Sequence, residues 1–175
     1  MRKRLALPED SSVAADFPSV LALLSDSGVE FVIVGGLAAT VHGSARLTED
    51  LDVVYRRTPE NLTRLAAALA PYAPYLRGAP PGLPFSLDPP TLQRGLNFKL
   101  TTSLGPLDLL GEIIGGGTYE ELLPDTAEVE LFGRRCRVLA LAALIRAKRA
   151  AGRPKDLEAI AELEALLSDT DPAEG

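Results

Sequence analysis

Apolar and polar residues follow two kinds of spacing along this chain, and the spacing predicts its helices and strands. Helices are predicted where apolar residues recur every three or four positions, over 17–27, 37–43, 58–69, 140–151 and 154–167. Strands are predicted over 30–34, 50–55, 95–102 and 107–113, followed by a hairpin over 127–141 centred on Gly133. Residues 71–90 contain seven of the fourteen prolines, which predicts an irregular connecting loop whose length also permits a lid.

The order of these elements predicts an α+β fold. A small mixed β-sheet would carry helices packed mainly on one side, with the last helices added at the C-terminus. At 175 residues, a single domain is expected over 1–170, with a core at about 14–139 and a helical part at about 140–168. Residues 169–175 are predicted to form a flexible tail.

Composition narrows the class of protein. The formal net charge of -6 argues against nucleic-acid binding over the whole surface but permits a local basic patch. The lone Cys136 excludes an internal disulfide and suggests a reducing compartment. No apolar run approaches the roughly 18 residues that a membrane helix needs. We therefore expect a cytoplasmic protein with no membrane partner.

Three acidic residues interrupt segments that otherwise look like buried strands. Asp50 and Asp52 are two positions apart, so they share one face of their strand. Asp108 stands between two leucines in a later strand. If the two strands are neighbours, three carboxylates converge, and two unit charges about 4 Å apart repel by about 4 kcal/mol at an effective dielectric of about 20. Divalent cations reverse that repulsion, and carboxylates suit two Mg²⁺ or Mn²⁺ ions in phosphoryl transfer.

Gly35 and Gly36 lie between a predicted strand and a predicted helix. Glycine lets a phosphate approach the backbone closely, and N–H groups at a helix start favour anions. The pair alone is weak evidence, and a plain turn is the alternative. The chain lacks the G-x-G-x-x-G and G-K-[ST] patterns of other phosphate-binding sites. Its position before Asp50-Leu51-Asp52 makes the combination specific.

The segments "VIVGGLAA" and "RLTEDLDVV", with the later "GPLDLL", resemble the motif of polymerase-β-like nucleotidyltransferases. Arg46, Thr48, Asp50 and Asp52, followed by "LIRAKRAAGRPKDLEAI", resemble the minimal nucleotidyltransferases of abortive-infection (AbiEii-like) and toxin–antitoxin systems. The resemblance extends over 30–160. It implies the nucleotidyltransferase fold and transfer of a nucleoside monophosphate from an NTP to an acceptor hydroxyl.

The same resemblance implies roles for individual residues. Asp50, Asp52 and Asp108 would be the catalytic residues and the ligands of two Mg²⁺ (or Mn²⁺) ions. Nucleotide binding is implied for Gly35, Gly36, Arg46, Lys148 and Lys155. Many relatives carry Ser as the second turn residue, whereas Gly36 offers only its backbone N–H, so the grip on the triphosphate must come from elsewhere. Asp156 would position one of the basic side chains.

Several alternatives stay open at the level of sequence. The eight basic residues of 134–155 either meet phosphate, including an RNA backbone, or form a solvated helix face. Asp108 is either a ligand or a turn acid. The acceptor implied by the toxin branch is an RNA end, such as that of tRNA, and the antitoxin-like branch implies AMP transfer to a partner protein. A cognate toxin or antitoxin is the expected partner, and a non-catalytic binding module is the remaining alternative.

Overall fold

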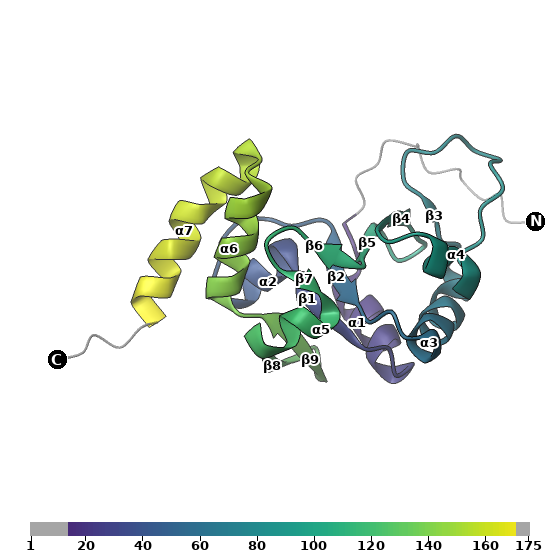
Figure 1. Cartoon of the computed structure of the whole chain (residues 1–175), viewed down its shortest axis with the longest axis horizontal. Coiled ribbons are helices and arrows are strands. Elements are labelled where there is room, and N and C mark those ends of the chain that lie inside the picture. The colour runs from purple at the N-terminus through teal and green to yellow at the C-terminus, as the bar shows by residue number, and fades with distance from the viewer. Residues whose placement is uncertain (1–13, 171–175) are drawn as a thin grey trace, which may run out of the picture.

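The computed structural model describes residues 14–170 and is built around a mixed sheet of seven strands (Figure 1). The strands are β1 (Phe31–Val34), β2 (Leu51–Tyr55), β3 (Tyr75–Leu76), β4 (Phe98–Thr101), β5 (Leu107–Leu110), β8 (Thr126–Leu131) and β9 (Arg134–Leu139). Their order across the sheet is β3-β4-β5-β2-β1-β9-β8. β1 is antiparallel to β2 and parallel to β9, and β2 is parallel to β5. The predicted α+β fold with a mixed sheet is confirmed.

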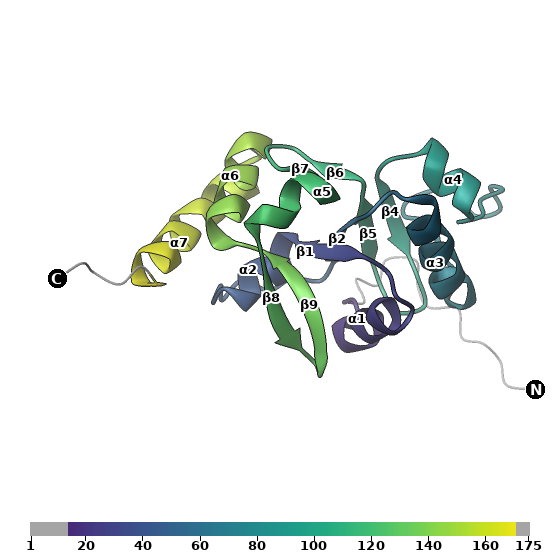
Figure 2. The same cartoon turned by 60° about the horizontal axis from the view of Figure 1, so that its bottom comes forward.

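The helices are α1 (Phe17–Asp26), α2 (Gly35–Val41), α3 (Pro59–Leu69), α4 (Pro89–Arg94), α5 (Tyr119–Leu122), α6 (Leu141–Ala151) and α7 (Pro154–Thr170). In both views, α6 and α7 lie together beyond one end of the molecule, and β3, β4 and α4 lie at the other end (Figures 1 and 2). Helix α2 contacts β1, β2 and α6, so it connects the sheet to the C-terminal helices.

The centre of the sheet is buried on both faces. All four residues of β1 are buried, and Leu51, Val53 and Val54 of β2 are fully inaccessible to solvent. Because successive side chains of a strand point to opposite faces, this burial shows that both faces of the central strands are covered. Asp52 is the one residue of β2 that is not fully buried.

Local sequence signals explain where several helices begin and end. Asp16 accepts a hydrogen bond from the backbone N–H of Ser19 and caps α1, and Thr58 caps α3 in the same way, as the Thr-Pro-Glu sequence predicts. Helix α6 ends at Gly152, whose φ of 65° is a left-handed conformation that favours glycine.

The segment 71–90 is more ordered than the predicted irregular loop. A 3₁₀ turn, η1 (Ala70–Tyr72), leads into the short strand β3, and α4 begins at Pro89 with Asp88 as its N-cap. β3 pairs with β4 in antiparallel orientation and forms one edge of the sheet. A two-residue strand is too short to show an alternating pattern, which is why the sequence did not indicate it.

The predicted single strand over 107–113 is interrupted at Gly111 and forms two strands, of which the second belongs to another sheet. Gly111 ends β5 because its N–H donates to the carbonyl of Leu96 and to the side chain of Asn97. A Cβ at this position would lie 2.8 Å from that same carbonyl oxygen, so only glycine fits without a shift. The chain then forms a separate hairpin, β6 (Glu112–Ile113) with β7 (Gly117–Thr118).

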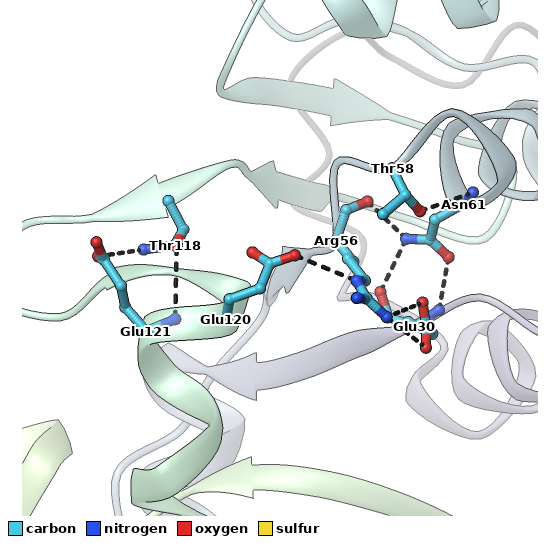
Figure 3. Close-up of polar contacts among 7 residues, drawn as sticks. All are labelled: Glu30, Arg56, Thr58, Asn61, Thr118, Glu120 and Glu121. Carbon is cyan, nitrogen blue, oxygen red and sulfur yellow. Dashed lines mark hydrogen bonds and ion pairs between the residues drawn. The ribbon is translucent and has the colours of Figure 1, made fainter.

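Polar contacts attach this inserted region to the main sheet (Figure 3). Arg56 donates to both carboxylate oxygens of Glu30 and to Glu120 at the start of α5, at 3.1 Å each. The buried Asn61 of α3 accepts from the N–H of Glu30 and donates to the carbonyls of Glu30 and Arg56. Thr118 and Glu121 form a capping box on α5. The network therefore connects α5 and α3 to the start of β1 and the end of β2.

The C-terminal part of the described chain consists of a β-hairpin followed by two helices. β8 and β9 pair around Phe132-Gly133, as predicted. Helix α7 continues to Thr170, so the first two residues of the predicted tail are helical, and 171–175 lie outside the described residues. Within 14–170, no helix combines the length and apolarity needed to cross a membrane.

Candidate active site

The three acidic residues lie near the first residues of two central strands, β2 and β5. β2 and β5 are neighbouring parallel strands, and Asp52 is directly opposite Asp108 in their register. Asp50 immediately precedes β2. Asp108 is buried, with 7% of its surface exposed, whereas the side chain of Asp50 is 47% exposed. The prediction that the three carboxylates converge depended on these two strands being neighbours, and they are.

Burial and repulsion change the ionisation of Asp52. Desolvation is the largest cause, followed by the charge of Asp108, a hydrogen bond with that carboxyl and the charge of Asp50, and together they raise the pKa of Asp52 to about 7. Lys155 partly offsets this rise. The carboxylate pair is thus unfavourable when both groups are ionised, which is the electrostatic condition under which a cation binds strongly.

Gly35 lies directly against Asp52. The φ of Gly35 is 66°, and a Cβ built there would lie 2.9 Å from Cγ and 3.0 Å from Cβ of Asp52. Rotating the carboxylate would not remove the contact with Cβ. The glycine is therefore required both by the backbone conformation and by the acid next to it.

Gly36 packs against Thr48 in the loop that precedes β2. A Cβ at Gly36 would lie 2.7 Å from Cβ of Thr48, and the Thr48 hydroxyl stands beside the same position. That hydroxyl donates to the carbonyl of Asp50 at 3.2 Å. In this chain, the hydroxyl of Thr48 therefore occupies the space that a side chain at position 36 would fill.

A pocket of about 440 Å³ opens in front of these residues. Its volume is in the range of small-molecule sites, roughly 300–1,000 Å³. The predicted site residues that line it are Gly35, Gly36, Arg46, Asp50, Asp52, Lys148 and Lys155. Asp108 does not line the pocket and lies beside Asp52 in the sheet. One cavity thus brings together residues that are more than 100 positions apart.

Asp156 organises the basic wall of this pocket. It is 2% exposed and accepts hydrogen bonds from the backbone N–H, Nε and Nη2 of Arg153, while Nζ of Lys148 lies 3.9 Å away. Burial raises the pKa of Asp156, but the hydrogen bonds and charge of Arg153, with the charge of Lys148, outweigh it and hold the pKa below the usual value. Burial lowers the pKa of Lys148, although Asp156 opposes this. The predicted positioning role of Asp156 agrees with these contacts.

Most of the basic run 134–155 is paired with acids from other parts of the chain. Six of its eight basic residues form ion pairs within the described structure: Arg134–Asp26, Arg137–Glu128, Arg146–Asp125, Lys148–Asp156, Arg149–Glu164 and Arg153–Asp156. Only Lys148, Arg153 and Lys155 of this run line the pocket. The run therefore provides a local cationic wall and not a continuous basic surface.

Arg77 is a site residue that the sequence analysis missed. Its Nη2 donates to Oδ1 of Asp108 at 2.8 Å, and its Nη1 lies 3.8 Å from Oδ2 of Asp50. Arg77 follows β3 within the proline-rich segment. That segment has no periodicity from which the contact could have been predicted.

The donor set fits divalent metal ions in its chemistry. Asp50, Asp52 and Asp108 offer carboxylate oxygens, which Mg²⁺ and Mn²⁺ prefer. A guanidinium already lies against two of these acids, so the cluster attracts positive charge. Across residues 14–170, no three acidic, histidine or cysteine side chains converge closely enough to hold an ion as they stand. Binding of one ion by all three carboxylates therefore requires their side chains to reorient.

Replacing Gly35 with Ala should destabilise the fold by more than about 2 kcal/mol, because a left-handed conformation and a close contact with Asp52 are both strained. Gly133→Ala is the matched control. Gly133 has a φ of 78°, and no atom lies within 4 Å of the position that its new methyl group would take, so only the backbone cost of about 1 kcal/mol applies. Chemical denaturation measures both changes. Equal losses in the two variants would contradict the contact at Asp52.

The raised pKa of Asp52 predicts how stability depends on pH. Between the unfolded value of 3.8 and about 7, the folded protein binds more protons at this group than the unfolded chain does. The metal-free protein should therefore lose stability as pH rises from about 5 to about 7. Asp52→Asn should abolish most of this loss. Asp26→Asn is the control, because Arg134 lowers the pKa of Asp26 and this acid does not titrate in that range. Denaturation in EDTA at several pH values tests the difference, and an unchanged slope in Asp52→Asn would contradict it.

Comparisons with known proteins support the fold. The sequence matches no protein-family model and no curated protein. Among solved structures, the chain is similar to the lincosamide antibiotic adenylyltransferase LnuA with lincomycin bound, with a TM-score of 0.57 and 14% identity over 87% of this chain and 98% of that one. It is also similar to TM1012 from Thermotoga maritima, provisionally described as a nucleotidyltransferase, with a TM-score of 0.54 and 16% identity over 86% and 93% of the two chains. The predicted nucleotidyltransferase fold is thereby confirmed.

Proposed function

We propose that this protein is a metal-dependent nucleotidyltransferase that transfers a nucleoside monophosphate from an NTP to an acceptor hydroxyl. The observation that carries the proposal is the pairing of Asp52 with Asp108 beside the Gly35 backbone, at a pocket with a cationic wall. The fold shared with LnuA and TM1012 agrees with it. A fold alone does not establish an activity, so the proposal depends on these side chains.

The pocket residues have complementary roles towards the nucleotide. The triphosphate would lie against Gly35 and Gly36, where the missing side chains allow close approach to the backbone. Lys148 and Lys155 would neutralise its charge from the opposite wall, and the Thr48 hydroxyl would supply the polar group that Gly36 lacks. Arg46, which is exposed at the rim, would contact the same phosphates.

Asp50, Asp52 and Asp108 would hold two Mg²⁺ (or Mn²⁺) ions. When bound, these ions supply Lewis-acid stabilisation of the attacking and leaving oxygens. The carboxylates also orient the reactants, because Asp52 and Asp108 are fixed by neighbouring strands.

The proposed transfer needs only the NTP and the acceptor hydroxyl as reactants. The acceptor oxygen forms a bond to the α-phosphorus while the bond from that phosphorus to the bridging oxygen breaks, and pyrophosphate leaves. Asp108 would accept the proton of the acceptor hydroxyl once its carboxylate turns from Arg77 towards the pocket. The ammonium group of Lys148 would stabilise the negative charge that develops on the leaving pyrophosphate.

The acceptor hydroxyl could belong to one of three classes of molecule. An RNA end and a partner protein are the acceptors implied by the toxin and antitoxin-like relatives. Ion pairing of six of the eight basic residues in 134–155 weighs against an extended RNA surface. LnuA is a lincosamide adenylyltransferase covered over 98% of its length, so a chain of this architecture suffices for a small-molecule acceptor in that protein. A small molecule with a hydroxyl group is therefore a further candidate acceptor, beside an RNA end and a partner protein.

Incubation with each α-³²P-labelled NTP and Mg²⁺, offering total RNA, total protein and a panel of hydroxyl-bearing small molecules in parallel, tests the proposal. We expect label in one acceptor class with wild type and a loss of more than about 100-fold with Asp52→Asn, because a charge that acts in the transition state is removed. Asp26→Asn should retain wild-type transfer, since this exposed acid lies outside the pocket. No label in any class would favour the non-catalytic module, and retained activity in Asp52→Asn would refute the role of that residue.

Lys148→Ala should raise KM for the NTP by about tenfold or more, since a charge-assisted contact to phosphate is lost. Its side chain is only 18% exposed and faces the pocket. Arg149→Ala is the matched control on the same helix, because Arg149 is exposed, pairs with Glu164 and does not line the pocket. Initial-rate kinetics measure both variants. A KM that is the same in the two variants would show that Lys148 does not bind the nucleotide.

A further inference from the structure

Arg77 joins two of the three acids of the proposed site. Its guanidinium donates to Asp108 at 2.8 Å and lies 3.8 Å from Asp50. The same Nη2 atom donates to the carbonyl of Leu100 in β4 at 2.8 Å. One cation thus contacts both the acid that lies outside the pocket and the most exposed of the three.

The sheet holds Arg77 in this position. Its backbone N–H donates to the carbonyl of Lys99 at 2.9 Å, which continues the pairing of β3 with β4. Lys99 is opposite Asp108 in the register of β4 and β5. The Arg77 side chain therefore reaches across β4 to β5, and it is only 29% exposed. A surface arginine that met an acid by chance would have neither the fixed backbone nor the carbonyl contact.

The contact engages one of the two carboxylate oxygens of Asp108. Oδ1 of Asp108 accepts a hydrogen bond from the guanidinium, and Asp108 is directly opposite Asp52 in the register of β2 and β5. This arrangement agrees with the finding that no three ligands within 14–170 converge on a common point. While the guanidinium donates to Oδ1, it places a positive charge next to any ion that Asp108 would bind, so turning of the carboxylate or withdrawal of Arg77 favours metal binding.

We propose that Arg77 is a positioning residue that neutralises Asp108 in the metal-free protein and opposes binding of a free divalent ion there. This inference rests on the proposed function. A metal ion that arrives with the NTP brings the negative charge of the phosphates with it, so the arginine opposes that complex less than the free ion. Arg77 thereby couples assembly of the metal site to the presence of nucleotide.

The test is Mn²⁺ binding without nucleotide, measured by the EPR signal of free Mn²⁺. Arg77→Gln should bind Mn²⁺ on the order of tenfold more tightly than wild type, because a positive charge a few ångströms from the ion is removed. The same variant should melt at a lower temperature in EDTA, since Asp108 loses its counter-ion. A merely structural role would lower the melting temperature without tightening Mn²⁺ binding.

Arg134→Gln is the matched control. Arg134 also donates to a carboxylate at 2.8 Å, that of Asp26, but away from the pocket. Its removal should leave Mn²⁺ affinity unchanged. Arg77→Lys keeps the charge but not the forked geometry, so its Mn²⁺ affinity should stay within about twofold of wild type. In transfer assays, Arg77→Lys should lower kcat several-fold at constant KM for the NTP, because the position of Asp108 is altered and the phosphate contacts are not.

Unchanged or weaker Mn²⁺ binding in Arg77→Gln overturns the inference, as does an absence of binding in both proteins at millimolar Mn²⁺. If Arg77→Gln does not fold, a wild-type kcat in Arg77→Lys overturns it instead. The two proposals fail separately. A wild type that transfers no nucleotide, combined with tighter Mn²⁺ binding in Arg77→Gln, refutes the proposed function and retains the role of Arg77. An active wild type with equal Mn²⁺ affinities refutes the role of Arg77 alone.

Discussion

Two carboxylates, Asp52 and Asp108, lie side by side in neighbouring strands of a sheet whose central positions are otherwise apolar. Folding places them there because Leu51, Val53, Leu107 and Leu109 on the same strands are fully buried, and the register that buries these residues also aligns the two acids. The hydrophobic core therefore supplies the free energy that offsets the repulsion. A slip of one residue would move these buried side chains to the opposite face and disrupt their packing, so packing fixes the alignment of the acids.

Different groups surround Asp52 and Asp108. On the pocket side, Gly35 presents backbone with no side chain, and Lys155 reduces the repulsion felt by Asp52. On the far side, Arg77 neutralises Asp108 through a position fixed by β4. The acids are thus partly neutralised by different cations. A ligand that enters the pocket changes the electrostatics of Asp52 directly and those of Asp108 only through its neighbours.

The strands that carry the acids were predictable because each is a short apolar run interrupted by an isolated aspartate. Gly35 and Gly36 were predictable from their place between a strand and a helix. Arg77 was not, because the two-residue β3 has no pattern and its pairing depends on β4, more than 20 positions later. The end of β5 at Gly111 depends on contacts with Leu96 and Asn97, which local sequence does not reveal. Local periodicity identified the longer elements, whereas short elements such as β3 and the end of β5 depend on contacts between distant segments.

The same distinction explains the basic run. In sequence, 134–155 contains eight cations and no acid, which suggests an extended anion-binding surface. In the fold, acids from α1, β8 and α7 neutralise most of these residues, and the chain as a whole carries a formal charge of -6. Most of the molecule therefore repels an anion, and attraction is confined to the wall of the pocket formed by Lys148, Arg153 and Lys155, because acids also line this pocket, namely Glu49, Asp50, Asp52, Asp156 and Glu162. Such focusing favours a compact anion like a triphosphate over a long polyanion, because a polyanion would also contact the surrounding acidic surface.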